Sequence, residues 1–334
     1  MSTASGSVLF LDATGQGFSR NLAAVRDELL GLRPALRMRY FFADLESRSA
    51  VRATERRSMR RLLDHASAQA GWVISASDSA YIRAHRGNED QRRILVLSPR
   101  LDLVDATVKR GKPTAGYTDV VIPGPAFAAA AQARFPGAHL HAGGLPVFSE
   151  LVSNEARERA RAELEVACPE SADKRVVVLT TQRTPQQVFG SSSVRELAAR
   201  LPEDVFLVLD IPKMLPTLES ETADLGQRVF VNDGSLGLFM LLALGDTLLT
   251  SRFRDAVYFS VTGRRLVLLN TQRNVGTLGD RLPSDYAPLG IADVTELPHA
   301  LAEPYDESAR LQFQHAYAVP NPASSVSSLV DELF

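Results

Sequence analysis

Short apolar runs, rich in β-branched residues, alternate with helical patterns along almost the whole chain. This alternation is typical of βαβ units, in which helices cover both faces of a parallel sheet. In the first half, strands are predicted at Ser7–Asp12, Leu36–Ala43, Trp72–Ser75, Arg93–Leu97, Val120–Ile122 and Ala138–Ala142. Helices are predicted at Asn21–Gly31, Ala50–Ala70 and Pro125–Phe135. The pattern therefore indicates the α/β class.

A second alternating series follows a polar stretch that ends in a breaker-rich segment near Asp173. Its predicted strands are Arg175–Thr180, Val205–Asp210, Val229–Asn232, Thr247–Thr250 and Leu266–Asn270, and helices are predicted at Asn154–Val166, Ser193–Leu201 and Leu236–Leu244. We expect two Rossmann-like domains, residues 1–150 and 151–334, with a terminal helix that could pack back on the first. Because open α/β sheets bind ligands at the carboxyl ends of their strands, function is expected in a central cleft that the two domains face.

Composition and charge exclude several classes of protein. Of the 334 residues, 45% are hydrophobic and 23% are charged, which excludes a disordered, collagen-like or coiled-coil chain. A net charge of −2 argues against a nucleic-acid binder, so any anion-binding surface must be local. The single cysteine, Cys168, excludes an internal disulfide and fits a cytoplasmic location. We expect neither a signal peptide nor a membrane span, because the apolar runs are too short for either.

Several motifs carry a resemblance to a known family. From Phe10 the sequence reads FLDATGQGFSRNLAAVRDEL. It resembles the opening strand, G-x-G-[YF]-S-x-N turn and A-[IV]-x-x-x-L helix of the CDP-glycerol glycerophosphotransferases, the teichoic acid polymerase and primase family. The turn at residues 143–146, the segment TTQR at residues 180–183 and the block at residues 246–263 match that family in the same order. Residues 313–334 resemble its C-terminal helix. The resemblance implies a GT-B-like fold and transfer of a group from a nucleotide-activated donor.

The sequence also departs from the family at its reactive positions. Ser98 stands where the family has the histidine assigned as catalytic base, and Ile211 stands where it has a second histidine. The paired serines that hold phosphate in the family become Phe253 and Arg254. Arginine can replace them, because its planar guanidinium group binds phosphate through two parallel hydrogen bonds. The chain has therefore either changed the family's chemistry or lost it.

Most candidate site residues follow from the resemblance position by position. Ser191, Ser192 and His141 follow instead from their places at a predicted helix N-terminus and a predicted strand end. The donor's phosphates are expected to contact Arg183, Ser191, Ser192, Thr250, Ser251, Arg252, Arg254 and Asp255. The acceptor, a polyol phosphate or a saccharide, is expected to contact Gly17, Ser19, Asn21 and Arg100. Ser98 and His141 are the candidates for catalysis. A CDP-linked donor is expected, without a cofactor. No metal is expected either, because no histidine pair has the i, i+4 spacing of a metal-binding helix face.

Each candidate also has a purely structural interpretation. Ser19 and the serines after Gly190 could cap helices, and His141 could be a buried histidine bonded to the backbone. An arginine stripe recurs every four residues along one predicted helix, at Arg48, Arg52, Arg56 and Arg60. It could contact an anionic membrane leaflet or a polymer phosphate, or it could be a solvated helix face.

Three functions remain open from the sequence. The first is transfer of a glycerophosphate, polyol-phosphate or glycosyl group from a nucleotide-activated donor to a cell-envelope acceptor. The second is a sugar-nucleotide epimerase or another GT-B glycosyltransferase, because residues 180–183 and the spacing from Thr250 to Gly263 resemble that superfamily too. The third is a catalytically degenerate scaffold that binds a nucleotide or a partner, which the missing histidines favour.

Overall fold

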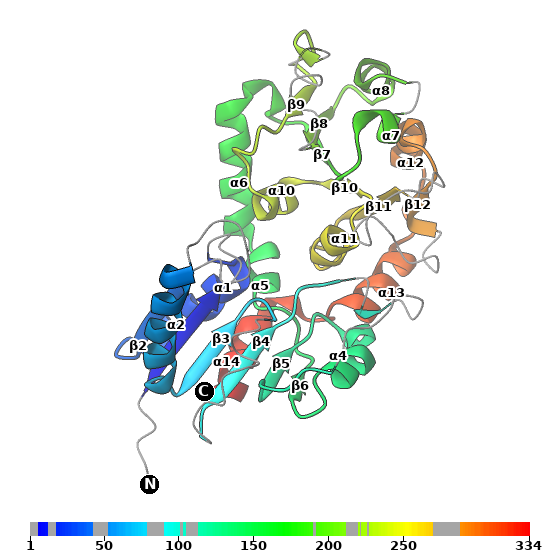
Figure 1. Cartoon of the computed structure of the whole chain (residues 1–334). Coiled ribbons are helices and arrows are strands. Elements are labelled where there is room, and N and C mark those ends of the chain that lie inside the picture. The colour runs from blue at the N-terminus through cyan, green and yellow to red at the C-terminus, as the bar shows by residue number, and fades with distance from the viewer. Residues whose placement is uncertain are drawn as a thin grey trace. The chain divides into compact units, whose positions relative to one another are not determined.

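The chain folds into two compact units (Figure 1). The computed structural model describes residues 6–12, 18–42, 53–78, 90–100, 103–104, 113–189, 192–211, 220, 222–225, 227–269 and 288–334. The first unit comprises residues 1–99, 106–150 and 321–334, and the second comprises residues 100–105 and 151–320.

The first unit is built on a six-stranded parallel sheet. Its strands are β1 (Ser7–Asp12), β2 (Arg37–Phe42), β3 (Trp72–Ser75), β4 (Arg92–Val96), β5 (Asp119–Val121) and β6 (His139–His141), in the order β2-β1-β3-β4-β5-β6. All six residues of β1 are buried, as expected for a central parallel strand that is covered on both faces. The chain passes from β1 to β2 on one side and then returns to β3 on the other. The strand order therefore reverses between β1 and β3.

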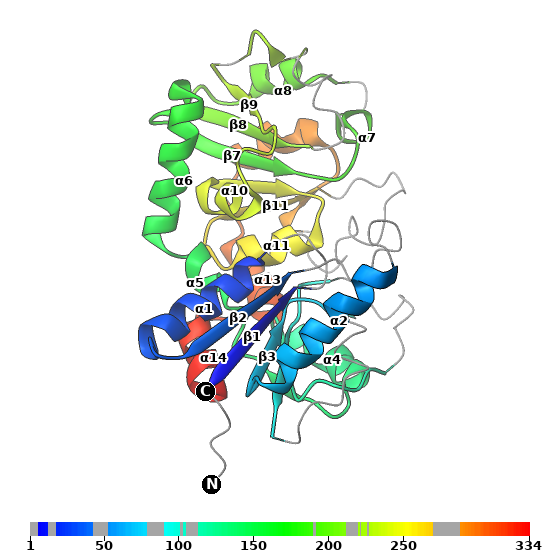
Figure 2. The same ribbon diagram turned by 60° about the vertical axis from the view of Figure 1, so that its left-hand side comes forward.

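The helices of the first unit include one from the far end of the chain. They are α1 (Arg20–Leu32), α2 (Ala53–Ala68), α4 (Ala128–Arg134), α5 (Val147–Leu151) and α14 (Ser325–Leu333). In α14 the side chains of Val326, Leu329, Val330 and Leu333 form one buried stripe at helical spacing. The helix packs against α1 (Figure 2). Each buried aliphatic side chain contributes about 1.5–3 kcal/mol, so this stripe stabilises the packing of α14 on the first unit.

The second unit contains another six-stranded parallel sheet. Its strands are β7 (Arg175–Thr180), β8 (Val205–Asp210), β9 (Val229–Val231), β10 (Thr247–Thr250), β11 (Arg265–Leu269) and β12 (Gly290–Ile291), in the order β12-β11-β10-β7-β8-β9. This is the doubly wound order of dinucleotide-binding folds, with its reversal between β7 and β10. Thr180 pairs with Thr250 in the register of these two strands, so both strands end side by side.

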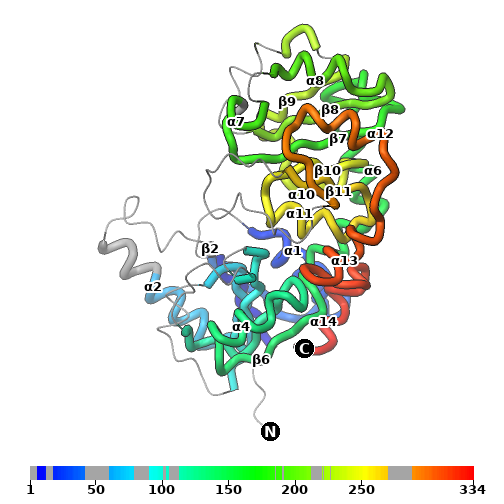
Figure 3. Tube along the Cα trace, turned by 90° about the vertical axis from the view of Figure 1, so that its right-hand side faces the viewer, coloured from blue at the N-terminus to red at the C-terminus, as the bar shows by residue number. Residues whose placement is uncertain are grey.

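The second unit has seven α-helices among its described residues. They are α6 (Asn154–Ala167), α7 (Pro185–Phe189), α8 (Val194–Arg200), α10 (Leu238–Leu244), α11 (Phe253–Ser260), α12 (Leu297–Ala302) and α13 (Glu307–Tyr317). Helix α6 packs against α10, and α13 packs against α11 (Figure 3). The second contact is aromatic: the ring of Tyr317 meets that of Phe253 edge-on, with 5.1 Å between the centroids.

The sheets confirm the α/β class and the two Rossmann-like halves that the sequence predicts. The predicted helix at Pro125–Phe135 is a 3-10 turn, Pro125–Phe127, followed by α4. Among the helices that the structure describes, none combines the length and the apolar character needed to cross a membrane.

Candidate functional site

A layer of hydroxyl groups lies where β7 and β10 end, at the reversal of strand order in the second unit. Thr180 and Thr250 are the last residues of these strands, and Thr181 and Ser251 follow them; all four are fully buried. The Thr180 hydroxyl donates to Oγ1 of Thr250 (2.8 Å), and the Thr250 hydroxyl donates to the Thr180 carbonyl (3.1 Å). The hydroxyls of Thr181 and Ser251 also bond to each other at 2.8 Å. These bonds join the two strand ends into one rigid layer.

The hydroxyl layer also fixes the backbone that carries two of the arginines. The backbone N–H of Arg252 donates to Thr250 Oγ1 (2.9 Å), and that of Arg183 donates to Thr181 Oγ1 (3.0 Å). A short polar side chain that accepts from the N–H two residues later stabilises a tight turn. Each strand therefore ends in a hydroxyl-stabilised turn that leads into an arginine.

Arg252 stands directly before α11 and is held by two carboxylates. Its Nε atom lies 3.0 Å from Oδ2 of Asp255, and its Nη1 atom lies 3.8 Å from Oδ2 of Asp210. Its side chain is 12% exposed, while that of Asp255 is fully buried. Arg254 adds a second contact to Asp255, at 3.3 Å, and its side chain is 45% exposed. The arrangement presents guanidinium groups at the surface and keeps the carboxylate beneath them.

Burial raises the pKa of Asp255, and the positive charges of Arg252 and Arg254 lower it only in part. Its Oδ2 atom accepts no well-directed hydrogen bond within the described part of the chain, so the contact to Arg252 is mainly one of charge. Burial therefore favours the neutral form of this carboxyl group, whereas the two guanidinium groups favour the carboxylate.

Two residues that the sequence did not single out complete this edge of the sheet. Asp210 ends β8, and Asn232 follows β9. The Asn232 amide donates to Oδ1 of Asp210 (2.9 Å) and to the Leu236 carbonyl (3.0 Å), and its Oδ1 accepts from the Leu236 N–H (3.1 Å). The sequence could have identified both residues by their position, because each is a polar residue at the carboxyl end of a predicted parallel strand.

Helix α11 begins at this edge without a side-chain cap. Arg252 occupies its N-cap position with extended backbone angles and forms no capping hydrogen bond. The first N–H groups of a helix carry a partial positive charge and bind anions readily. The N-terminus of α8 differs, because Ser193 and Glu196 cap it through a reciprocal pair of bonds.

The remaining residues that the sequence predicts to contact the donor are Ser191 and Ser192. Ser192 lies between α7 and α8, where its N–H donates to the Phe189 carbonyl (2.9 Å). Ser191 lies outside the described residues.

The acceptor candidates of the first unit have structural roles in addition to any binding role. Ser19 caps α1 by accepting from the Leu22 N–H (3.3 Å). Asn21 is buried, and its Oδ1 accepts from the Val147 N–H (3.1 Å), so it ties α1 to the start of α5. Ser98 is half-buried just after β4. Gly17 lies outside the described residues, and Arg100, which is exposed, belongs to the second unit.

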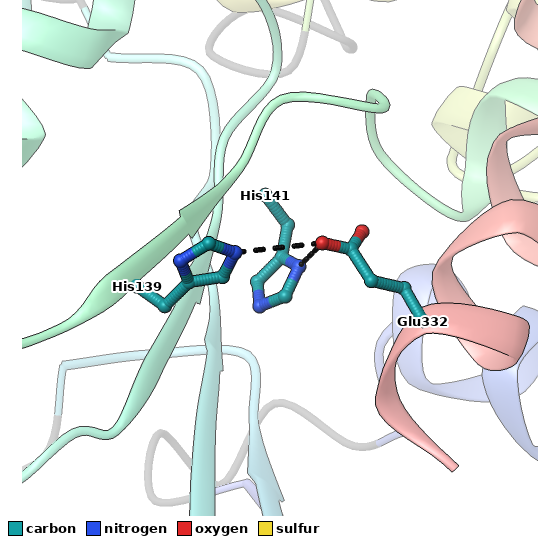
Figure 4. Close-up of side chains that lie close together, drawn as sticks. All are labelled: His139, His141 and Glu332. Carbon is teal, nitrogen blue, oxygen red and sulfur yellow. Dashed lines mark ion pairs between the residues drawn. The ribbon is translucent and has the colours of Figure 1, made fainter.

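His141 lies at the end of β6, is 2% exposed, and faces the Glu332 carboxylate (Figure 4). Its Nε2 atom is 2.9 Å from Oδ1 of Asp119, and its Nδ1 atom is 2.9 Å from Oε1 of Glu332. Burial alone would lower the pKa of His141, but the two carboxylates more than offset this and raise it. A general-base role would require this buried network to open.

Two of the four arginines in the stripe are among the residues that the structure describes. Arg56 and Arg60 belong to α2, and the Arg60 side chain is exposed. Arg48 and Arg52 lie outside the described residues.

Comparison with known proteins identifies the fold. No family model matches the sequence, and a search of curated proteins finds no match either. The solved structure of the wall teichoic acid polymerase TagF matches 98% of this chain and 88% of its own, with a TM-score of 0.68 and 13% identity. The UDP-GlcNAc 2-epimerase from Neisseria meningitidis, bound to UDP-GlcNAc, matches 98% of both chains with a TM-score of 0.55 and 12% identity.

The chain has a GT-B-like fold. A TagF variant soaked with CDPG matches over 98% of this chain and 89% of its own, with a TM-score of 0.65 and 14% identity. At such identities the likeness establishes the GT-B-like fold, and the chemistry must be argued from the residues at the strand ends.

Proposed function

We propose that this chain is a transferase that uses a nucleotide-activated donor, and that its second unit binds the donor's phosphates at the ends of β7 and β10. The observation that carries the proposal is the position of Arg252. It lies at the reversal of strand order, at the uncapped start of α11, and two carboxylates and a hydroxyl-stabilised turn hold it in place. In open α/β sheets this is where ligands bind.

Protonation of Asp255 would shift the charge balance of this cluster in favour of an anion. The guanidinium groups of Arg252 and Arg254 contact the carboxylate of Asp255, and Nη1 of Arg252 also lies 3.8 Å from that of Asp210. The raised pKa of Asp255 increases the positive excess whenever this group takes up a proton. A diphosphate can then replace part of the carboxylate contacts of Arg252 without leaving an unpaired buried charge.

The hydroxyl layer serves mainly as a frame in this proposal. The Thr180 and Thr250 hydroxyls are bonded to each other and to the backbone, so donor contacts fall to the guanidinium groups and to the first N–H groups of α11. In the transfer step an acceptor hydroxyl oxygen would bond to the transferred group as the bond to the nucleotide breaks, and the hydroxyl proton would pass to solvent. Arg252 and Arg254 would stabilise the negative charge that develops on the leaving phosphate.

The nature of the donor and acceptor is also part of the proposal. TagF has been soaked with CDPG and the epimerase structure contains UDP-GlcNAc, so CDP-linked polyols and UDP-sugars are the donors to test first. We propose a polyol phosphate or a saccharide of the cell envelope as acceptor, bound through Ser19, Asn21 and Ser98 of the first unit and through Arg100 of the second. The exposed Arg60 on α2, with its neighbours in the arginine stripe, would contact an anionic polymer or membrane surface.

The test measures nucleotide binding to the full chain and to matched variants. Calorimetry with CDP-glycerol, CDP-ribitol, CMP, UDP-GlcNAc and GDP-mannose is expected to show one clear preference. At a ligand concentration of 100 times Kd, that ligand stabilises the protein by about 2.7 kcal/mol. Arg252→Ala and Arg254→Ala should each weaken its binding at least tenfold. Arg195→Ala is the control, since it removes an exposed arginine that is paired with Asp224 in the same unit.

Two results would overturn the proposal. One is that no nucleotide binds; the other is that binding is unchanged in both arginine variants. Tight binding without release of the free nucleotide in the presence of any acceptor would favour the degenerate scaffold instead. A reaction that converts a UDP-sugar to its epimer would favour the epimerase.

A further inference from the structure

Two histidines and a glutamate from distant parts of the sequence meet at the edge strand of the first unit (Figure 4). His139 and His141 are neighbours on one face of β6, and Glu332 comes from α14. Oε1 of Glu332 lies 2.9 Å from Nδ1 of His141 and 3.5 Å from Nε2 of His139. The three ligand atoms all lie within 4.8 Å of one another.

Asp119 fixes the orientation of the His141 ring on the side away from Glu332. Asp119 lies 2.9 Å from Nε2, and Asp119 is itself held by Arg92, whose Nε donates to Oδ2 (3.1 Å), and by the Thr118 hydroxyl (2.6 Å). Because Arg92 and Thr118 both donate to it, Asp119 is placed to accept a hydrogen bond from the His141 ring. A carboxylate that accepts from one ring nitrogen sets the tautomer and directs the lone pair of the other nitrogen outward.

That outward nitrogen needs a positive partner. Nδ1 of His141 belongs to a side chain that is 1% exposed, and it forms no well-directed hydrogen bond within the described part of the chain. It faces the Glu332 carboxylate instead. With Nε2 donating to Asp119, a neutral ring and a carboxylate would turn lone pairs toward each other at 2.9 Å. This contact is favourable only with a proton or a metal ion between the two atoms.

The third ligand decides between a proton and a metal ion. A proton on Nδ1 would need only Glu332, yet His139 directs its Nε2 toward the same carboxylate oxygen. Zinc binds histidine nitrogen at about 2.0–2.1 Å and carboxylate oxygen at about 2.0–2.2 Å, so tetrahedral ligand atoms stand about 3.4 Å apart. The observed separations of 2.9 and 3.5 Å lie on either side of this value. Glu332 and His139 are more than half exposed, so both side chains have room to adjust.

We propose that His139, His141 and Glu332 bind a divalent transition-metal ion such as Zn²⁺, with Asp119 as the positioning residue behind His141. Three protein ligands leave a fourth position for water or another ligand. The ion would link the edge strand β6 to the C-terminal helix α14 and hold that helix on the first unit. The site is independent of the nucleotide site proposed above, because all four residues belong to the first unit.

The test uses the full chain after treatment with a chelator. Titration with Zn²⁺ in a calorimeter is expected to show one saturable site per chain and to raise the melting temperature. Co²⁺ is expected to give the visible absorption of a tetrahedral nitrogen–oxygen site, and Mg²⁺ is expected to bind far more weakly. His139→Ala and Glu332→Gln change exposed side chains, so both variants should fold, and each should raise the Kd for Zn²⁺ at least tenfold.

A matched control separates the proposed site from chance binding at the surface. His299→Ala removes an exposed histidine whose Nε2 atom lies 3.7 Å from the Glu303 carboxylate one helical turn away, without a third ligand. Its Kd for Zn²⁺ should equal that of the wild type. The proposal is overturned if Zn²⁺ shows no saturable binding, or if His139→Ala and Glu332→Gln bind Zn²⁺ as the wild type does.

Discussion

Arg252 and Asp255 face each other across the first turn of α11, with 3.0 Å between Nε and Oδ2, and the carboxylate is completely buried beneath the guanidinium group. A buried charge is costly unless an opposite charge and hydrogen bonds compensate for it. Here the charge is compensated while one carboxylate oxygen lacks a well-directed hydrogen bond, as judged over the described residues. Two effects therefore oppose each other at Asp255: burial favours the neutral acid, and the ion pair with Arg252 favours the carboxylate.

The raised pKa of Asp255 makes the free energy of unfolding fall as the pH rises. Because burial raises the pKa of Asp255 above its ordinary value of 3.8, the folded chain binds this proton more tightly than the unfolded chain does. The stability contributed by protonation is complete below about pH 3.8 and is lost as the pH rises through the raised pKa. Asp255→Asn mimics the neutral acid. Relative to this variant, wild-type stability should fall as the pH rises above about 4, by at most about 1.4 kcal/mol per pH unit.

Urea unfolding at several pH values, followed by circular dichroism, measures this difference. Asp204→Asn is the control with the opposite sign, because the hydrogen bond from Arg175 lowers the pKa of that exposed carboxylate. Parallel pH profiles of the wild type and Asp255→Asn would show that the pKa of Asp255 is not raised.

The hydroxyl of Thr250 makes the bonds that connect β7, β10 and α11. It accepts from the Thr180 hydroxyl and from the Arg252 N–H, and it donates to the Thr180 carbonyl. Thr250→Val keeps the shape but leaves these buried groups without a partner, which should cost about 1–3 kcal/mol. Thr250→Ser keeps the hydroxyl and should cost less. Urea unfolding of both variants measures the difference, and equal losses would mean that the methyl group, not the hydroxyl, matters.

Strands could be predicted more closely than helices, for a physical reason. The predicted strands Ser7–Asp12, Trp72–Ser75, Arg175–Thr180 and Thr247–Thr250 agree with the structure to the residue, because a buried parallel strand is a continuous apolar run. Helix α11 lacked such a signal. Its eight residues span only about two helical turns, too few for a helical period to stand out in the sequence.

The two sites differ in how far the sequence could predict them. Arg252 and Asp255 are separated by three residues, so their contact follows from one helical turn once α11 is known. The contact of His141 with Glu332 depends on where α14 packs, and no local pattern contains that information. The i, i+4 rule for metal-binding histidines does not apply to His139 and His141, because they lie on a strand, where residues two apart share a face.

Asn21 offers a test of whether an acceptor candidate acts through binding or through the fold. Its buried Oδ1 accepts from the Val147 N–H, so Asn21→Ala should destabilise the first unit by about 1–3 kcal/mol. Ser19→Ala removes the cap of α1 and should cost about 1 kcal/mol. The fluorescence of Trp72, the single tryptophan, reports unfolding of this unit. Unchanged stability of Asn21→Ala together with a higher acceptor KM would instead assign Asn21 to the acceptor.

The C-terminal helix should contribute measurably to the stability of the first unit. Leu329 is 3% exposed within the apolar stripe of α14, so Leu329→Ala should cost about 2–5 kcal/mol. Leu62→Ala is the control, because Leu62 is 67% exposed on α2 and its loss should change stability by no more than about 0.5 kcal/mol. Trp72 is again the probe, since its ring lies 5.1 Å from that of Phe334, the last residue. If Leu329→Ala unfolds at the same urea concentration as the wild type, then α14 is not an integral part of this unit, and a metal ion bound by Glu332 could not stabilise it.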